Sequence, residues 1–117
     1  YKGEQSERII TFTKKALKLE MIVEVNDTDV LAKKILAILN MTKADGDILS
    51  VKATNNYNDE TPVWEDITSK SVTKMVHQYE NITKTATMGK IALWITITKA
   101  SDESQRSVIR GLSGGYE

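Results

Sequence analysis

Two segments of the chain alternate between apolar and polar residues with a period of two, which is the pattern of a β-strand with one buried face. Over residues 17–25 the apolar side of the alternation holds Leu17, Leu19, Met21, Val23 and Val25. Over residues 90–98 the apolar side holds Ile91, Leu93, Ile95 and Ile97. β-branched residues dominate the second segment, as a pleated sheet favours. Both segments are therefore predicted to be strands, and Trp94 falls on the side opposite the apolar face of its strand.

Shorter apolar runs lie between turns that are rich in Asn, Asp and Gly. Residues 48–54 alternate in the same way, with Leu49, Val51 and Ala53 on one face. Just before them, an Asp45-Gly46 pair supplies the positive φ angle of a tight turn, which predicts a hairpin over residues 43–48. Further short strands are expected in residues 72–83 and 106–112.

Residues 26–40 admit two interpretations. A helix capped near Asp27 would align Leu31, Ile35, Ile38 and Leu39 in one stripe. A strand over residues 34–42 would place Ile35, Ala37, Leu39 and Met41 on one face. The β character of the rest of the chain favours the strand.

This succession of short strands and polar turns predicts an all-β fold, a single β-sandwich or jelly-roll-like domain over residues 1–117. We expect at most one short helix, near residues 28–40. A polar N-terminal lead-in (residues 1–7) and a Gly-rich C-terminal tail (residues 111–117) flank the strands.

The composition of the chain narrows the classes of partner that it is expected to bind. The 117 residues suit one domain, and 40% apolar with 27% charged residues suits a folded chain. Sixteen basic and 16 acidic residues give zero formal net charge, so nothing steers the chain toward nucleic acid or an anionic membrane. Its apolar runs are far shorter than the ~18 residues of a membrane helix. Neither nucleic acid nor a membrane is therefore expected as a partner.

The sequence offers little catalytic chemistry. It has no cysteine, nucleophile elbow, phosphate loop or zinc signature. The only histidine, His77, has no evident partner and predicts a surface or strand-pairing residue. The neighbouring carboxylates Asp59-Glu60 and Glu65-Asp66 would point to opposite faces of a strand, which predicts solvated charges. We therefore expect no catalytic residues, no metal site and no cofactor, and a protein that is not an enzyme.

The stretch NNYNDETPVWEDIT, residues 55–68, sets aromatic side chains in a polar surrounding. It does not follow the spacing of an EF-hand loop, so its Asn and Asp residues predict turns rather than a calcium site. Tyr57 and Trp64 could form a sugar-binding lip. The favoured interpretation is a long hairpin connection, in which Pro62 stiffens the return and Trp64 covers the end of the core.

The segment VKATNNYNDETPVWEDIT resembles small structural proteins of tailed bacteriophages and prophages of Gram-positive bacteria. The similarity covers roughly residues 48–116, and Met88-Gly89 stands where those proteins have an aromatic residue before the glycine. The matching positions beyond this segment are Tyr79, Asn81, Thr83, Lys84, Thr85, Ala86, the strand at 91–97, Ile109, Gly111, Gly114, Gly115 and Tyr116. The resemblance implies a virion component, a capsid decoration or a tail- or fibre-associated protein, without enzymatic activity.

Two functional expectations follow. The first is a virion structural protein, located in the virion, that packs against other virion subunits and forms a homo-oligomer. The alternative is a carbohydrate-binding β-sandwich that contacts a host-surface glycan. Under either expectation the interface or glycan-contact candidates are Tyr57, Trp64, Trp94 and Tyr116.

Overall fold

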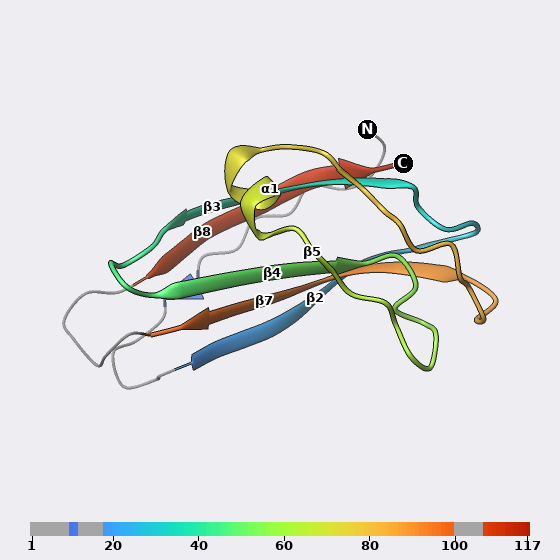
Figure 1. Cartoon of the computed structure of the whole chain (residues 1–117), viewed down its shortest axis with the longest axis horizontal. Helices are drawn as coiled ribbons and strands as arrows, with labels where there is room; N and C mark the ends of the chain where they lie inside the picture. The colour runs from blue at the N-terminus through green and yellow to red at the C-terminus, as the bar shows by residue number, and fades with distance from the viewer. Residues whose placement is uncertain (1–9, 12–17, 100–106) are drawn as a thin grey trace.

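Two antiparallel four-stranded sheets make up the molecule (Figure 1). The structure is a computed structural model that describes residues 10–11, 18–99 and 107–117, so the lead-in at residues 1–7 lies outside it. The first sheet has the order β1 (Ile10–Thr11), β8 (Val108–Tyr116), β3 (Lys34–Thr42) and β6 (His77–Gln78). The second has the order β2 (Lys18–Thr28), β7 (Gly89–Thr98), β4 (Ile48–Thr54) and β5 (Glu65–Asp66). The all-β prediction is confirmed.

The strand orders are those of a jelly roll. β1 pairs with β8, β2 with β7, β3 with β6 and β4 with β5, so the described strands pair as one long antiparallel hairpin. Rolling up that hairpin places β3 beside β8 and β4 beside β7. Consecutive strands consequently lie in different sheets at every step except from β4 to β5.

The core lies between the two sheets, as the alternation predicts. The second sheet contributes the buried residues Val23, Val51, Ala53, Ile91, Leu93, Ile95 and Ile97. The first sheet contributes Ile35, Ala37, Leu39, Ile109 and Leu112. Burying each large aliphatic side chain stabilises the fold by roughly 1.5–3 kcal/mol. On the other face of the second sheet Trp94 lies between Ile22 of β2 and Lys52 of β4.

The expected helix near residues 28–40 is wrong, and the strand interpretation of residues 34–42 holds. Alternate burial of Ile35, Ala37 and Leu39 against the opposite sheet outweighs the helix propensity of Leu, Ala and Lys. The helix is instead α1 (Thr68–Thr73), in a region where no helix was expected. It ends at Thr73 and is capped by Lys74, whose φ of 62° is left-handed.

Two glycine predictions need correction. Gly46 has the expected positive φ, 82°, but its turn carries the chain from β3 in one sheet to β4 in the other and is not a hairpin. The Gly-rich segment 111–117 is not a tail, because β8 runs through it to Tyr116. There Gly114 allows a close approach of β3, since a Cβ on it would lie 1.7 Å from the carbonyl oxygen of Leu36.

Candidate functional site

Three of the four sequence candidates meet on the outer face of the second sheet, and we call Tyr57, Trp64 and Trp94 the aromatic trio. The ring centroids of Trp64 and Trp94 are 5.4 Å apart, and those of Tyr57 and Trp64 are 5.7 Å apart. Lys52 Nζ lies 5.2 Å from the ring centroid of Trp94. The indole N–H of Trp94 donates to Glu20 Oε2 over 3.0 Å. The trio therefore joins β7 to the connection between β4 and β5.

The geometry of the trio is that of a packed layer. Each neighbouring pair of rings is inclined by 65°, an edge-to-face arrangement that favours mutual packing. Rings inclined in this way do not form one flat platform for several sugar units, although a single ring face can still stack on one sugar. All three side chains are half-buried. The connection is a long hairpin loop as expected, but Trp64 packs on the outer face of the sheet and not on the end of the core.

Tyr116 does not join the trio. It is the last residue of β8, in the other sheet, and its side chain packs against the core from a half-buried position. Its hydroxyl accepts a hydrogen bond from Asn26 Nδ2 over 2.7 Å. Its role is therefore to connect the end of β8 to β2.

Three polar residues of the loop after β4 are internal. Asn55, Asn56 and Asp59 are all buried. The Asp59 carboxylate accepts the backbone N–H groups of Ala86 over 2.8 Å and of Thr85 over 2.9 Å. These two hydrogen bonds, that of Ala86 first, lower the pKa of Asp59. The prediction of a solvated charge is wrong for Asp59, which ties the β4–β5 loop to the segment before β7.

Asn55 makes a second tie at the same end of the sandwich. Its side-chain amide donates to the carbonyl oxygens of Ala32 over 3.0 Å and of Asn81 over 3.1 Å. In return Asn81 Nδ2 donates to Asn55 Oδ1 over 2.8 Å. Asn55 thus satisfies backbone groups of two other segments, as a buried amide must.

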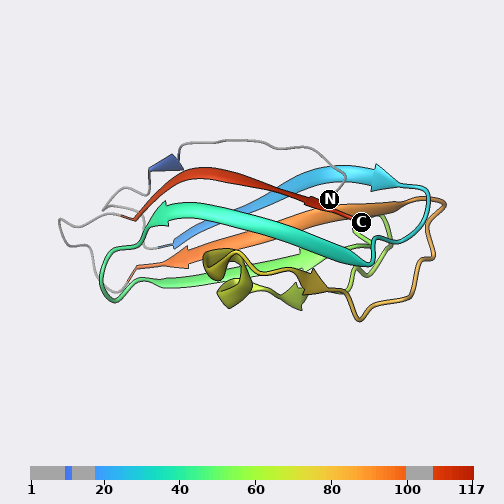
Figure 2. The ribbon, with the colours of Figure 1, turned by 90° about the horizontal axis from the view of Figure 1, so that it is seen from above.

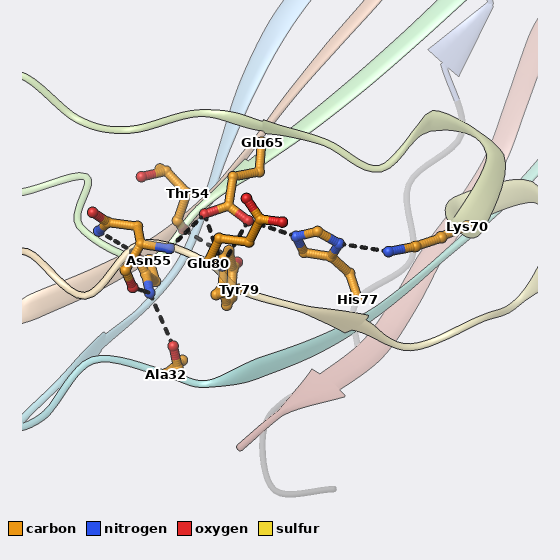
Figure 3. A network of polar contacts seen from close by, with 9 residues as sticks. Ala32, Thr54, Asn55, Glu65, Lys70, His77, Tyr79 and Glu80 are labelled. Carbon is orange, nitrogen blue, oxygen red and sulfur yellow. Dashed lines mark hydrogen bonds and ion pairs between the residues drawn. The ribbon is translucent and has the colours of Figure 1, made fainter.

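The only histidine is the centre of a buried polar chain (Figure 3). His77 Nε2 lies 2.7 Å from Glu65 Oε1, and His77 Nδ1 lies 2.9 Å from Lys70 Nζ. Because a lysine ammonium can only donate, Nδ1 accepts and Nε2 carries the proton that is donated to Glu65. His77 pairs with Ile35 along the strand, as predicted, but it is buried and not on the surface.

Glu65 anchors the other end of this chain. Its carboxylate accepts the backbone N–H groups of Glu80 and Asn81, each over 3.0 Å. Burial alone would raise the pKa of Glu65, but the hydrogen bonds from Glu80, His77 and Asn81 outweigh it and lower the pKa. Burial also raises the pKa of the neighbouring Tyr79 phenol, and the charge of Glu65 adds to this effect. No pattern in the sequence indicates this network, because β5, α1 and β6 bring its members together only in the folded chain.

The network links α1, β6 and β5 through Lys70, His77 and Glu65. Both ring nitrogens of His77 are occupied by Glu65 and Lys70, so neither is placed to activate a hydroxyl group. Among the described residues no group of three or more His, Asp or Glu side chains is placed to hold a metal ion. The described part of the chain also contains no helix that could span a membrane.

Comparisons of the chain with protein-family models, with curated proteins and with solved structures find no match.

Proposed function

We propose that the protein is a structural subunit of a bacteriophage virion, a capsid decoration or a tail- or fibre-associated component, that acts by packing against other subunits. The observation that carries the proposal is the jelly-roll order of the eight described strands. This architecture recurs in viral capsid proteins, where its two sheets provide a rigid block with loops at both ends. The resemblance of residues 48–116 to phage structural proteins supports the same class.

The surface is also consistent with a packing role. A formal net charge of zero lets copies pack densely without self-repulsion. Several large apolar side chains are exposed, including Ile48, Val72, Met75 and Val76 on and around α1. Apolar residues grouped on a surface suit contact with a partner protein.

Immunogold electron microscopy tests the proposal. Phage particles induced from the bacterium that carries the gene are purified on a density gradient and labelled with an antibody raised against the purified chain. Regular labelling of one part of the particle is expected, with the chain detected in the same fraction by mass spectrometry. A chain that stays in the soluble fraction and is absent from intact particles would contradict the proposal.

A second candidate function, binding of a host-surface glycan, is favoured by one observation. The half-buried aromatic trio carries a cation, Lys52, and a carboxylate, Glu20, beside the indole of Trp94. Aromatic faces flanked by hydrogen-bonding side chains are suited to a sugar ring. A glycan array probed with the purified chain and with Trp64→Ala distinguishes the two functions, with Ile82→Ala as a control at a side chain that is 90% exposed. A signal lost only in Trp64→Ala would support glycan binding.

A further inference from the structure

A groove is lined by residues of α1, of the end of β3, of the start of β4 and of the turn between them, and we call it the α1 groove. Figure 2 shows α1 beside β3 and β4. Its volume is about 770 Å³. Apolar side chains line it, namely Met41, Ile48, Leu49 and Val72. Three charged residues also line it: the exposed Lys43 and Asp66, and the buried Asp47, whose Oδ2 lies 3.6 Å from Lys99 Nζ. Ile48 and Val72 are 66% and 54% exposed, and Met41 and Leu49 are only half-buried although they point toward the core.

The groove exists because β5 is short. β5 ends at Asp66, and the chain then leaves the sheet to form α1. The last backbone contact with β4 is at Val51, whose carbonyl oxygen accepts the N–H of Ile67 over 2.8 Å. Val51 N–H donates to Thr68 Oγ1 over 2.9 Å. From Val51 back to Ile48, β4 has no neighbouring strand on this side among the residues that the structure describes.

The backbone of Leu49 is therefore the free part of this edge. Val51 directs its N–H and C=O away from β7, and backbone groups two residues apart in a strand point the same way. Leu49 N–H and C=O consequently face the α1 groove. In the described part of the chain neither group has a hydrogen-bond partner on that side. An edge with an unpaired donor and acceptor is a template for another strand.

We propose that the α1 groove binds an extended segment of a partner polypeptide, which adds as a strand antiparallel to β4. Every strand pairing of the second sheet is antiparallel, and one partner residue would exchange both hydrogen bonds with Leu49. The side chains of that residue and of the residue two positions further along the segment would enter the apolar groove, as in other complexes formed by strand addition.

Charge complementarity fixes the order of residues in the partner segment. An antiparallel segment enters beside Asp66, at the β5 end, and leaves beside Lys43, at the start of β4. Lys43 Nζ contacts only carbonyl oxygens among the described residues, those of Asp47 over 2.9 Å and Ala44 over 3.4 Å. The segment is thus basic, then alternately apolar, then acidic. This inference goes beyond the proposed virion function and does not depend on it.

A designed peptide tests the inference without any phage particle. The probe is an N-acetylated, C-amidated heptapeptide with the order lysine, valine, threonine, valine, threonine, valine, glutamate. It is titrated into the ¹⁵N-labelled chain, and amide shifts are followed by NMR spectroscopy. We expect shifts centred on Leu49, Thr68 and Val72. The first valine is the residue that stands opposite Leu49, because Val51 is already bonded to Ile67 and Thr68. N-methylation of this valine removes one donor and is expected to weaken binding about tenfold, the equivalent of one good hydrogen bond.

Matched variants locate the site. Ile48→Asp and Val72→Asp are each expected to weaken binding at least about tenfold, because they place a charge against the apolar peptide. Ile82→Asp is the control, since Ile82 is 90% exposed and does not line the groove. All three side chains are exposed, so the variants should fold, and circular dichroism checks this. The inference is overturned by no shift at millimolar peptide, by shifts centred elsewhere, or by equal affinity of the N-methylated peptide. Equal affinity of a peptide with lysine and glutamate exchanged would overturn the antiparallel orientation.

Discussion

Asp59 is a side chain whose position in the sequence conceals its role. It sits in an Asn- and Asp-rich turn, where exposure is the ordinary expectation, yet it is 6% exposed and accepts two backbone N–H groups. Those donors come from Thr85 and Ala86, which are 26 and 27 residues further along the chain. No local pattern marks such a contact, so the sequence predicted a turn here but not the anchor within it.

Asp59→Asn is expected to lower the melting temperature, and the melting temperature of the variant should fall less than that of the original chain as the pH is lowered. The folded pKa of Asp59 is lowered from its ordinary value of 3.8, so its stabilising contribution is present above about pH 4. That contribution is lost as the pH falls through the folded pKa. Melting temperatures measured by circular dichroism from pH 2 to pH 7 should show the two proteins converging at the acid end. The control is Glu60→Gln, at an exposed neighbour, and a constant difference at all pH values would contradict the expectation.

His77→Phe is expected to reduce the free energy of unfolding by about 1–3 kcal/mol, because Glu65 and Lys70 each lose a hydrogen-bond partner in a buried site. His77→Gln is the matched control. Its terminal amide carries both a donor and an acceptor, so it can keep part of the chain and should cost less. Urea unfolding measures the free energy of unfolding of both variants. Equal losses in the two variants would mean that the size of the ring, and not its two hydrogen bonds, is what matters.

At the level of the elements, the alternation of apolar and polar residues correctly predicted the strands that have one face in the core. Residues 34–42, 48–54 and 90–98 all place their expected apolar side inward. The helix α1 was missed because six residues composed mainly of Thr, Ser and Val give no helical stripe and have low helix propensity. Residues 43–48 show a different limit of prediction from the sequence. The sequence specifies a positive φ at Gly46, but it does not specify which sheet the next strand joins.

Gly114→Ala tests the pairing of β3 with β8. The φ of Gly114 is 144°, and an added Cβ would meet the backbone of Leu36. Either the strands separate or the residue adopts a strained backbone, so we expect a loss of at least about 2 kcal/mol in the free energy of unfolding. Gly115→Ala is the control, since the φ of Gly115 lies outside the positive region. Urea titrations of the two variants should differ clearly, and equal effects would show that the close approach at Gly114 is not specific.

For the molecule as a whole, the sequence predicted the class of fold but not the order of the strands. Jelly-roll pairing joins β1 to β8 and β2 to β7, partners at opposite ends of the chain, so no local signal specifies it. The long edge strand β2 also shows how an open edge is protected. Within the described residues it pairs only with β7, and it carries charged residues and a bulge between Glu24 and Asn26. Charges and bulges of this kind hinder uncontrolled strand addition. The β4 edge at Leu49 has apolar residues in their place, which is the contrast that makes it a docking candidate.

The aromatic trio provides a test that compares folding with assembly. If it is a second packed layer of each subunit, Trp94→Ala removes the ring that Trp64 and Lys52 contact. The free energy of unfolding should then fall by about 2–3 kcal/mol, less than the 3–5 kcal/mol of a fully buried tryptophan because Trp94 is only half-buried. Tyr57→Ala should cost less, since Tyr57 is the outer member and contacts only Trp64 within the trio.

Light scattering of the same variants shows whether the trio is a packed layer within each subunit or an interface between subunits. We expect the purified chain to form a homo-oligomer whose mass is unchanged by Trp94→Ala, because the rings of the trio are occupied by one another and by Lys52. Chemical unfolding measured at several protein concentrations shows how much of the stability comes from association. A Trp94→Ala protein that keeps its unfolding free energy but falls to the mass of a monomer would identify the trio as the subunit interface. In that case the edge-to-face packing would serve to hold Trp94 in position for a neighbouring copy, and its role in folding would be secondary.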